Sequence, residues 1–344
     1  MKTENRSPGL DLIRCLAMLF VVTYHFFLRN GFNLAPQTGV ATWAAGCFRT
    51  LTTSCIGLFL MLTGYLKSDR TGLRSCYRCL VPILLAYLLA SAFSIPIRHF
   101  LLNDPKSLVD WGKSLIQFTA VYYGWYVEMY LGLVLLMPFI NILLNQLHSK
   151  GLLALTGILF LLTAMPGALP WNIFPDFWRA LFPITYYVLG AAIRRLQPRI
   201  PPWAGIAGAG SMAILLGTIT FSSASLTLST GVYWEFPDLW TVLMAVCLFV
   251  SFYRLPIPAP FQKLLAFGSM GCYGACLLSH LFDIWSYQLL PQWHTPQRYP
   301  LLFVCVTVPI YLISLVLGNL LHKLTNLLSI PIAKLLHSNK QKTS

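Results

Sequence analysis

About ten apolar runs, separated by short polar segments, divide this chain along its whole length. They lie near 10–28, 51–66, 80–102, 124–147, 151–169, 180–196, 203–222, 238–254, 264–287 and 300–322. A helix needs about 20 apolar residues to cross a bilayer core of about 30 Å, and only helices and closed barrels satisfy their backbone in lipid. We therefore predict an all-α fold, a polytopic membrane bundle of about ten transmembrane helices.

Composition supports the same class of protein. Hydrophobic residues make up 57% of the 344 and charged residues 10%, which excludes an ordinary soluble domain. No soluble block or low-complexity linker interrupts the runs, so we expect one integral-membrane domain over 1–344, with a basic tail from about 323 that is solvated or contacts anionic lipid. The net charge of +14 would suit nucleic acid, but the positions of the basic residues argue against such a partner.

The basic residues are distributed unevenly between the two sides of the predicted bundle. With the N-terminus inside, 16 of the 24 Lys and Arg residues fall in cytoplasmic segments. Arg14 alone is left within a span, and seven residues fall outside: Arg29, Arg49, Arg98, Lys106, Lys113, Arg179 and Arg298. This asymmetry follows the positive-inside rule, so we expect both termini in the cytoplasm of a multi-pass protein, in the bacterial inner membrane.

Arg14 and His25 lie eleven residues apart on the first apolar run. At about 100° per residue they return to nearly one face, about 16 Å apart along the axis. Ionisable groups inside a membrane are costly and mark candidate functional sites. The structural alternative is an Asp11–Arg14 pair near one surface, with His25 at the far interface.

Three groups capable of proton transfer are predicted to share one layer near the outer face. His25 and His280 lie at similar depths in runs that point outward, and Glu128 lies about one turn into a run that points inward. Histidine is suited to remove a proton from a hydroxyl or amine. The two histidines could instead be interfacial, and Glu128 could face an aqueous cavity without taking part in chemistry.

The opposite layer is cationic. Arg14 lies near the cytoplasmic end of its run, and Arg70, Arg74 and Arg78 follow the second run at intervals of four. If that segment is helical, the three arginines line one face and present guanidinium groups that match phosphate oxygens. Topogenic positive charge is the alternative. The two layers together suggest a donor with an anionic head and a reactive end about 16 Å away, a description that fits acyl-coenzyme A.

Four ordered motifs resemble the integral-membrane acyltransferase family of type 3. They are the Arg-x10-His pair Arg14–His25; Gly57-Leu-Phe-Leu-Met-Leu-Thr-Gly-Tyr65, with Thr63 in place of the usual Ser; the helix from Gly124-Trp-Tyr to Pro138; and Gly268-Ser-Met-Gly-Cys-Tyr-Gly-Ala-Cys-Leu-Leu-Ser-His280. Arg78-Cys-Leu-Val-Pro82 also matches, although the usual arginine three residues earlier is Ser75. The resemblance implies transfer of an acyl group, commonly acetyl, from cytoplasmic acyl-CoA to an extracytoplasmic or membrane-linked acceptor, often a sugar hydroxyl.

On this interpretation each candidate residue receives a role. We assign His25 as general base, Arg14 to donor positioning or gating, and Glu128 to orienting the base or the acceptor. Arg74 and Arg78 would hold the donor phosphates of acetyl-CoA. Tyr65, Trp125, Tyr126 and His280 would line the path, Tyr65 on the donor side and the other three toward a glycan or lipid-linked sugar. We expect no metal, because Cys76 and Cys79 lack a second ligand pair at zinc spacing.

Two other classes of function fit part of the pattern. A non-enzymatic transporter of a small polar solute, such as an amino acid, would also need buried charges along a polar path. An interaction scaffold would leave those charges unexplained. Loss of an acyl mass from an envelope component on deletion of the gene would favour the enzyme.

Overall fold

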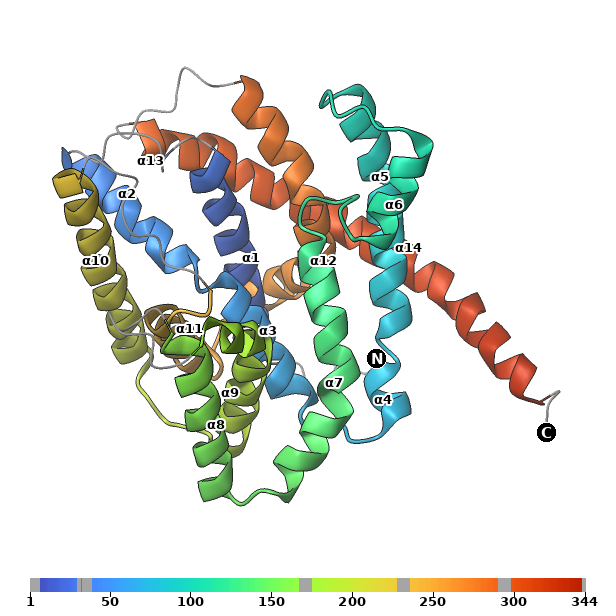
Figure 1. Cartoon of the computed structure of the whole chain (residues 1–344), viewed down its shortest axis with the longest axis horizontal. Coiled ribbons are helices and arrows are strands. Elements are labelled where there is room, and N and C mark those ends of the chain that lie inside the picture. The colour runs from blue at the N-terminus through green and yellow to red at the C-terminus, as the bar shows by residue number, and fades with distance from the viewer. Residues whose placement is uncertain are drawn as a thin grey trace.

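The computed structural model of the chain describes residues 7–29, 32, 39–166, 175–227, 236–289 and 298–341 (Figure 1). These described residues form helices and turns and contain no strand. The helices are α1 (Pro8–Arg29), α2 (Gly39–Thr52), α3 (Cys55–Lys67), α4 (Leu73–Tyr77), α5 (Leu80–Phe100), α6 (Leu108–Ile116), α7 (Trp125–Gln146), α8 (Ser149–Ala164), η2 (Asp176–Leu181), α9 (Phe182–Leu196), α10 (Pro202–Thr227), α11 (Leu239–Phe252), α12 (Ala259–Leu289), α13 (Tyr299–Leu302), η5 (Phe303–Thr307) and α14 (Val308–Gln341).

Seven helical stretches in the described part of the chain are long and apolar enough to cross a membrane. They are Pro8–Arg29, Gly39–Lys67, Leu73–Phe100, Trp125–Gln146, Pro202–Ser222, Ala259–Ile284 and Tyr299–Ser329. Two shorter apolar helices, Ser149–Ala164 and Leu239–Phe252, accompany them. The all-α membrane bundle is therefore as predicted, and each of the ten predicted runs overlaps a helix. The expected number of ten spanning helices goes beyond what these lengths establish.

α1 lies inside the bundle, between α12 and α3 (Figure 1). α3 packs closely on α9, and α12 packs closely on α14. Glycines allow these approaches: a β-carbon at Gly64 would collide with the backbone of Tyr187, and one at Gly190 with that of Met61. Small residues at helix contacts are typical of membrane proteins, where close van der Waals packing replaces hydrophobic association.

Two arginines assigned to external segments are buried in candidate spans instead. Arg49 and Arg98 are each 3% exposed, so the expectation that Arg14 alone lies within a span was wrong. Arg98 is compensated by Asp104, with Nη2 2.5 Å from Oδ2, and its Nη1 donates to the carbonyls of Thr119 and Ala120. The guanidinium of Arg49 lies 5.8 Å from the ring centroid of Tyr24. Such partners lower the cost of burying a cation, and except for Asp104 they lie more than 20 residues away along the chain.

Two polar segments also form helices that the apolar pattern did not predict. α2 occupies much of the stretch 29–50 and belongs to the same candidate span as α3. α6 lies within 103–121 and is capped by Ser107, whose hydroxyl accepts a hydrogen bond from the amide of Asp110 at 3.1 Å. Side-chain capping of a helix start depends on local chemistry and needs no apolar run.

Candidate functional site

His25 lies in the last turns of α1 with its ring half-buried. Its Nδ1 is 2.7 Å from the carbonyl oxygen of Val21. A carbonyl can only accept, so Nδ1 carries the proton and Nε2 keeps a lone pair. The imidazole is therefore held in the tautomer that a general base requires, with Nε2 as the basic atom.

Tyr123, in the turn that leads into α7, packs against His25. The ring centroids are 3.9 Å apart and the planes are tilted by 35°. The hydroxyl of Tyr123 donates to Oδ2 of Asp283 at 2.8 Å. Burial and the nearby Asp283 carboxyl raise the pKa of Tyr123 well above its ordinary value, so the hydroxyl stays protonated. His25 is thereby linked to an acidic group through the face of one ring.

Asp283 was missed by sequence reasoning. It is fully buried in α12, and its Oδ1 has no hydrogen-bond partner among the described residues. An acidic residue inside the apolar run 264–287 was a signal that could have found it, because such residues are rare in membrane segments unless they serve a site.

His280 contacts the same tyrosine from α12. Its ring is fully buried, 5.7 Å from the ring of Tyr123 and edge-on to it. Nδ1 is 2.9 Å from the carbonyl of Leu277, and within the described chain Nε2 has no partner. The structure thus brings His25 and His280 together around Tyr123.

Glu128 is not part of this cluster. It lies in the first turn of α7 with an exposed side chain, and the described part of the structure shows no hydrogen bond or ion pair to it. The acidic group nearest to His25 by contact is Asp283, through Tyr123. The assigned role of Glu128 therefore stays a prediction.

An open cleft of about 620 Å³ is lined by Tyr24, whose ring lies edge-on to that of His25. Its walls include Tyr24, Trp125 and Phe236. The rings of Trp125 and Phe236 are stacked, with centroids 6.0 Å apart and planes at 18°. Arg179 also lines the cleft and pairs with Asp238 at 2.7 Å. The cleft combines aromatic faces with a paired cation, an arrangement typical of sites for small polar ligands.

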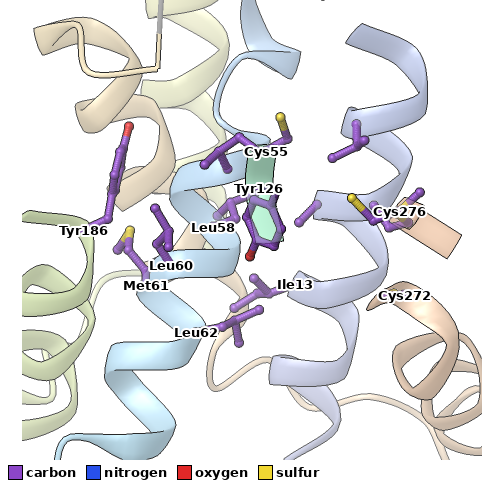
Figure 2. Close-up of a cluster of buried hydrophobic side chains, with 14 of the residues drawn as sticks. Ile13, Cys55, Leu58, Leu60, Met61, Leu62, Tyr126, Tyr186, Cys272 and Cys276 are labelled. Carbon is purple, nitrogen blue, oxygen red and sulfur yellow. The ribbon is translucent and has the colours of Figure 1, made fainter. Parts of the chain in front are cut away.

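Tyr126 has a different environment from its neighbour Trp125. It is 8% exposed and lies in the bundle core, where Figure 2 shows its ring among Leu58, Leu62 and Ile13. Leu58 and Leu62 belong to α3 and Ile13 to α1. The predicted path residues Trp125 and Tyr126 therefore occupy two separate places, the cleft and the interior.

Arg14 lies near the opposite end of α1, about 16 Å from His25 along the axis. Its Nη1 donates to the hydroxyl of Ser269 on α12 at 2.5 Å and to Oδ1 of Asp11 at 3.4 Å. The side chain of Arg14 is 28% exposed, whereas that of Asp11 is 5% exposed. The structural pair with Asp11 therefore exists, and a second bond ties Arg14 to α12.

Tyr65 lies at this same end of the bundle. Its ring is 5.9 Å from that of Tyr253, whose carbonyl accepts a hydrogen bond from Ser7, just before α1. The carbonyl of Tyr65 accepts from Arg194 at 2.8 Å, and Arg194 also pairs with Asp69. Tyr65 is thus placed near the Arg14 end, as part of a polar network.

The arginines at positions 70, 74 and 78 do not share one helix face, so that expectation was wrong. α4 contains only Leu73–Tyr77; Arg70 precedes it and Arg78 follows it. The break begins at Gly72, whose backbone is extended (φ −75°, ψ 130°). Arg74 and Arg78 have exposed side chains.

Among the described residues, no group of three or more His, Cys, Asp or Glu side chains could hold a metal ion.

Comparison with known proteins confirms the resemblance. The sequence profile of the type 3 acyltransferase family, described as an acyltransferase domain, matches residues 7–319. No curated protein and no solved structure matches the chain. The match contains α1 with Arg14 and His25, α7 and the α12 segment with His280, all within a bundle of apolar helices. The chain therefore belongs to the type 3 acyltransferase family and is an integral, multi-pass membrane protein.

Proposed function

We propose that this protein transfers an acyl group, acetyl in the simplest case, from cytoplasmic acyl-CoA to a hydroxyl of an envelope glycan or lipid-linked sugar, in the bacterial inner membrane. The observation that carries the proposal is the state of His25: Nδ1 is bonded to the Val21 carbonyl at 2.7 Å, which leaves Nε2 as a base, and the ring lies edge-on to Tyr24, which lines an aromatic cleft. Arg14 lies at the other end of the same helix, on the side that the positive-inside count assigns to the cytoplasm.

In direct transfer, Nε2 of His25 removes the proton of the acceptor hydroxyl while that oxygen attacks the thioester carbonyl. The carbon–sulfur bond then breaks, the thiolate of coenzyme A leaves, and the imidazolium returns its proton to the sulfur. The positive charge on the ring is transient. The face of Tyr123 and the carboxylate of Asp283 behind it are placed to stabilise that charge.

A sugar acceptor is supported by the cleft that Tyr24 lines. Aromatic rings such as Trp125 and Phe236 pack against the apolar faces of a pyranose, and the Arg179–Asp238 pair offers hydrogen-bond donors and acceptors to its hydroxyls. Trp125 is 39% exposed, so its ring is accessible to a ligand.

A donor with phosphates is supported by the cations at the Arg14 end. Arg74 and Arg78 are exposed there, and guanidinium groups bind phosphate oxygens in bidentate fashion. The axial distance of about 16 Å between Arg14 and His25 is comparable to the length of an extended pantetheine arm. Donor phosphates at one end would thus present the thioester at the other.

The test compares cells that carry the wild-type gene, a His25→Ala variant or no gene. Mass spectrometry of envelope glycans should find an acyl mass that the wild type adds and that His25→Ala loses, because loss of a general base typically costs about 10² to 10⁴ in rate. His148→Ala is the matched control, since His148 is an exposed residue between α7 and α8. Membrane expression is measured for each variant.

Two results would count against the proposal. Near-normal acyl transfer by His25→Ala would remove His25 from the mechanism. An envelope unchanged by deletion of the gene, combined with gene-dependent uptake of a small polar solute, would favour the transporter.

A further inference from the structure

Four cations that lie partly or fully within the described bundle have carboxylate partners at close range. The pairs are Arg14–Asp11 (3.4 Å), Arg98–Asp104 (2.5 Å), Arg179–Asp238 (2.7 Å) and Arg194–Asp69. This pairing follows from the cost of desolvating a charge, which an opposite charge offsets.

Lys67, the last residue of α3, departs from this pattern. Its side chain is half-buried, and its Nζ donates to the hydroxyl of Tyr130 at 3.3 Å and to the thiol of Cys79 at 3.4 Å. Its Nζ also lies 5.7 Å from the centroid of the Tyr130 ring. The hydroxyl and the thiol are ordinarily uncharged at neutral pH. Within the described chain, no carboxylate pairs with Lys67, so its charge is available to an anion.

A row of tyrosines connects Lys67 with the base. Tyr123, Tyr126 and Tyr130 lie at intervals of three and four, which places them on one face of α7 and of the turn before it. Tyr123 packs on His25, and the rings of Tyr126 and Tyr130 are stacked 6.0 Å apart at 12°. The axial distance from Tyr123 to Tyr130 is about 10 Å, which an acyl-pantetheine arm can span.

The row lies inside the bundle rather than on its surface. The ring of Tyr126 sits between α1 and α3 (Figure 2), and Lys67 reaches Tyr130 from the end of α3. A ligand anchored at Lys67 that reaches His25 would have to pass Tyr126, which is 8% exposed, so its arm would displace core side chains along this row. Arg74 and Arg78 lie on α4 and directly after it, so they would meet a donor outside this interior site.

We propose that Lys67, with Tyr130 as a second hydrogen-bond donor, binds a phosphate group of the acyl donor and orients its acyl arm toward His25. The identity of the donor rests on the proposed function, whereas the anion site rests on the missing carboxylate and the two contacts of Nζ. A bound phosphate would supply Lys67 with the negative charge that Asp residues supply to Arg14, Arg98, Arg179 and Arg194.

Binding to the purified full-length protein in detergent tests the proposal by titration calorimetry. The probes are coenzyme A, pantetheine, which lacks phosphates, and inorganic pyrophosphate. Lys67→Met keeps nearly the same side-chain length and removes the charge. It should weaken the binding of coenzyme A and of pyrophosphate by about 10- to 100-fold, the effect of losing a charged hydrogen bond. Pantetheine binding should not change. Lys67→Arg should retain most of the affinity, and the exposed Lys263→Met on α12 is the matched control.

The outcomes separate this inference from the proposed function. Equal coenzyme A affinity in Lys67→Met and wild type overturns the phosphate site and leaves acyl transfer standing. If the wild type does not bind coenzyme A but binds pyrophosphate, and Lys67→Met loses that binding, the anion site is supported and the proposal of an acyl-CoA donor is contradicted. Weakened binding of pantetheine in both Lys67→Met and Lys67→Arg would indicate a structural role and would overturn the proposal.

Discussion

His25 and His280 receive different chemistry from their surroundings although each uses Nδ1 to bond a backbone carbonyl. His25 is half-buried in the turn next to the cleft, whereas His280 is fully enclosed. On the proposed function, the acceptor hydroxyl therefore meets Nε2 of His25 and not that of His280. The two histidines have the same side chain, so the difference in their proposed roles comes from the exposure of each ring.

The Tyr123–Asp283 pair leads to a prediction about turnover. Asp283→Asn preserves the shape and an acceptor for the Tyr123 hydroxyl, but it removes the ionisable carboxyl behind the ring that faces His25, whose charge the proposed role requires. We expect kcat to fall about tenfold, equivalent to about 1.4 kcal/mol of lost charge stabilisation, with KM nearly unchanged. Steady-state kinetics in proteoliposomes would measure both constants.

A matched control is available on α5. Tyr87→Phe removes a buried polar group outside the Tyr123 cluster, a hydroxyl that donates to the carbonyl of Leu115 at 3.1 Å. Its kcat should stay close to that of the wild type. Equal kcat in Asp283→Asn and wild type would show that the carboxylate does not assist the base.

Arg14 carries a prediction about geometry rather than charge. Arg14→Lys keeps the cation but loses the planar fork that now bonds Ser269 and Asp11. We expect normal expression and a raised KM for the acyl donor. Ser269→Ala is the control, because it breaks the bond to α12 and leaves the guanidinium. Normal kinetics in Arg14→Lys, with Arg14→Ala failing to accumulate, would identify a purely structural role.

At the scale of elements, close packing of α3 on α9 is a requirement of the bundle. Gly64→Ala would place a β-carbon against the backbone carbonyl of Tyr187, which cannot move without its helix. We expect destabilisation of about 1–3 kcal/mol, the usual cost of overpacking, seen as a lower midpoint of thermal unfolding in detergent.

Gly132→Ala on α7 provides the contrast. Its β-carbon would meet no atom within 4 Å, and alanine favours a helix over glycine by up to about 1 kcal/mol. The unfolding midpoint should stay or rise. A midpoint for Gly64→Ala as high as that of the wild type would contradict the need for close packing of α3 on α9.

The segment after α3 shows how an element-level expectation fails. The interval of four between Arg70, Arg74 and Arg78 fits one helix face, yet the extended backbone at Gly72 separates Arg70 from α4. Glycine loses more conformational freedom in a helix than other residues do, which favours a break at this position. The spacing of the arginines therefore fits a helix, but the backbone from Arg70 to Arg78 is not one continuous helix.

For the molecule as a whole, the orientation in the membrane can be tested directly. In a variant whose nine cysteines are replaced, single cysteines at Arg78 and at Asp110, exposed on α6, should label from opposite sides of the membrane. Acyl-CoA should protect position 78 and leave position 110 reactive. Labelling of both positions from one side would contradict the topology.

The sequence by itself determined the class of fold and the main candidates. Apolar length is a local property, so the runs located helices α1, α5, α7, α10 and α12 without tertiary information. The eleven-residue interval between Arg14 and His25 and the position of His280 likewise pointed to residues in the family match. The contacts between polar side chains could not be predicted from local patterns, because these contacts join residues far apart in sequence.

Only the tertiary structure decided which polar groups meet. Tyr123 and Asp283 are 160 positions apart, yet one hydrogen bond joins them beside His25. Arg49 and Arg98 looked external by charge, but the Tyr24 ring and the carbonyls of Thr119 and Ala120 compensate their burial from other segments. Whether a charge can be buried depends on the groups around it in space, and helix packing alone brings those groups together.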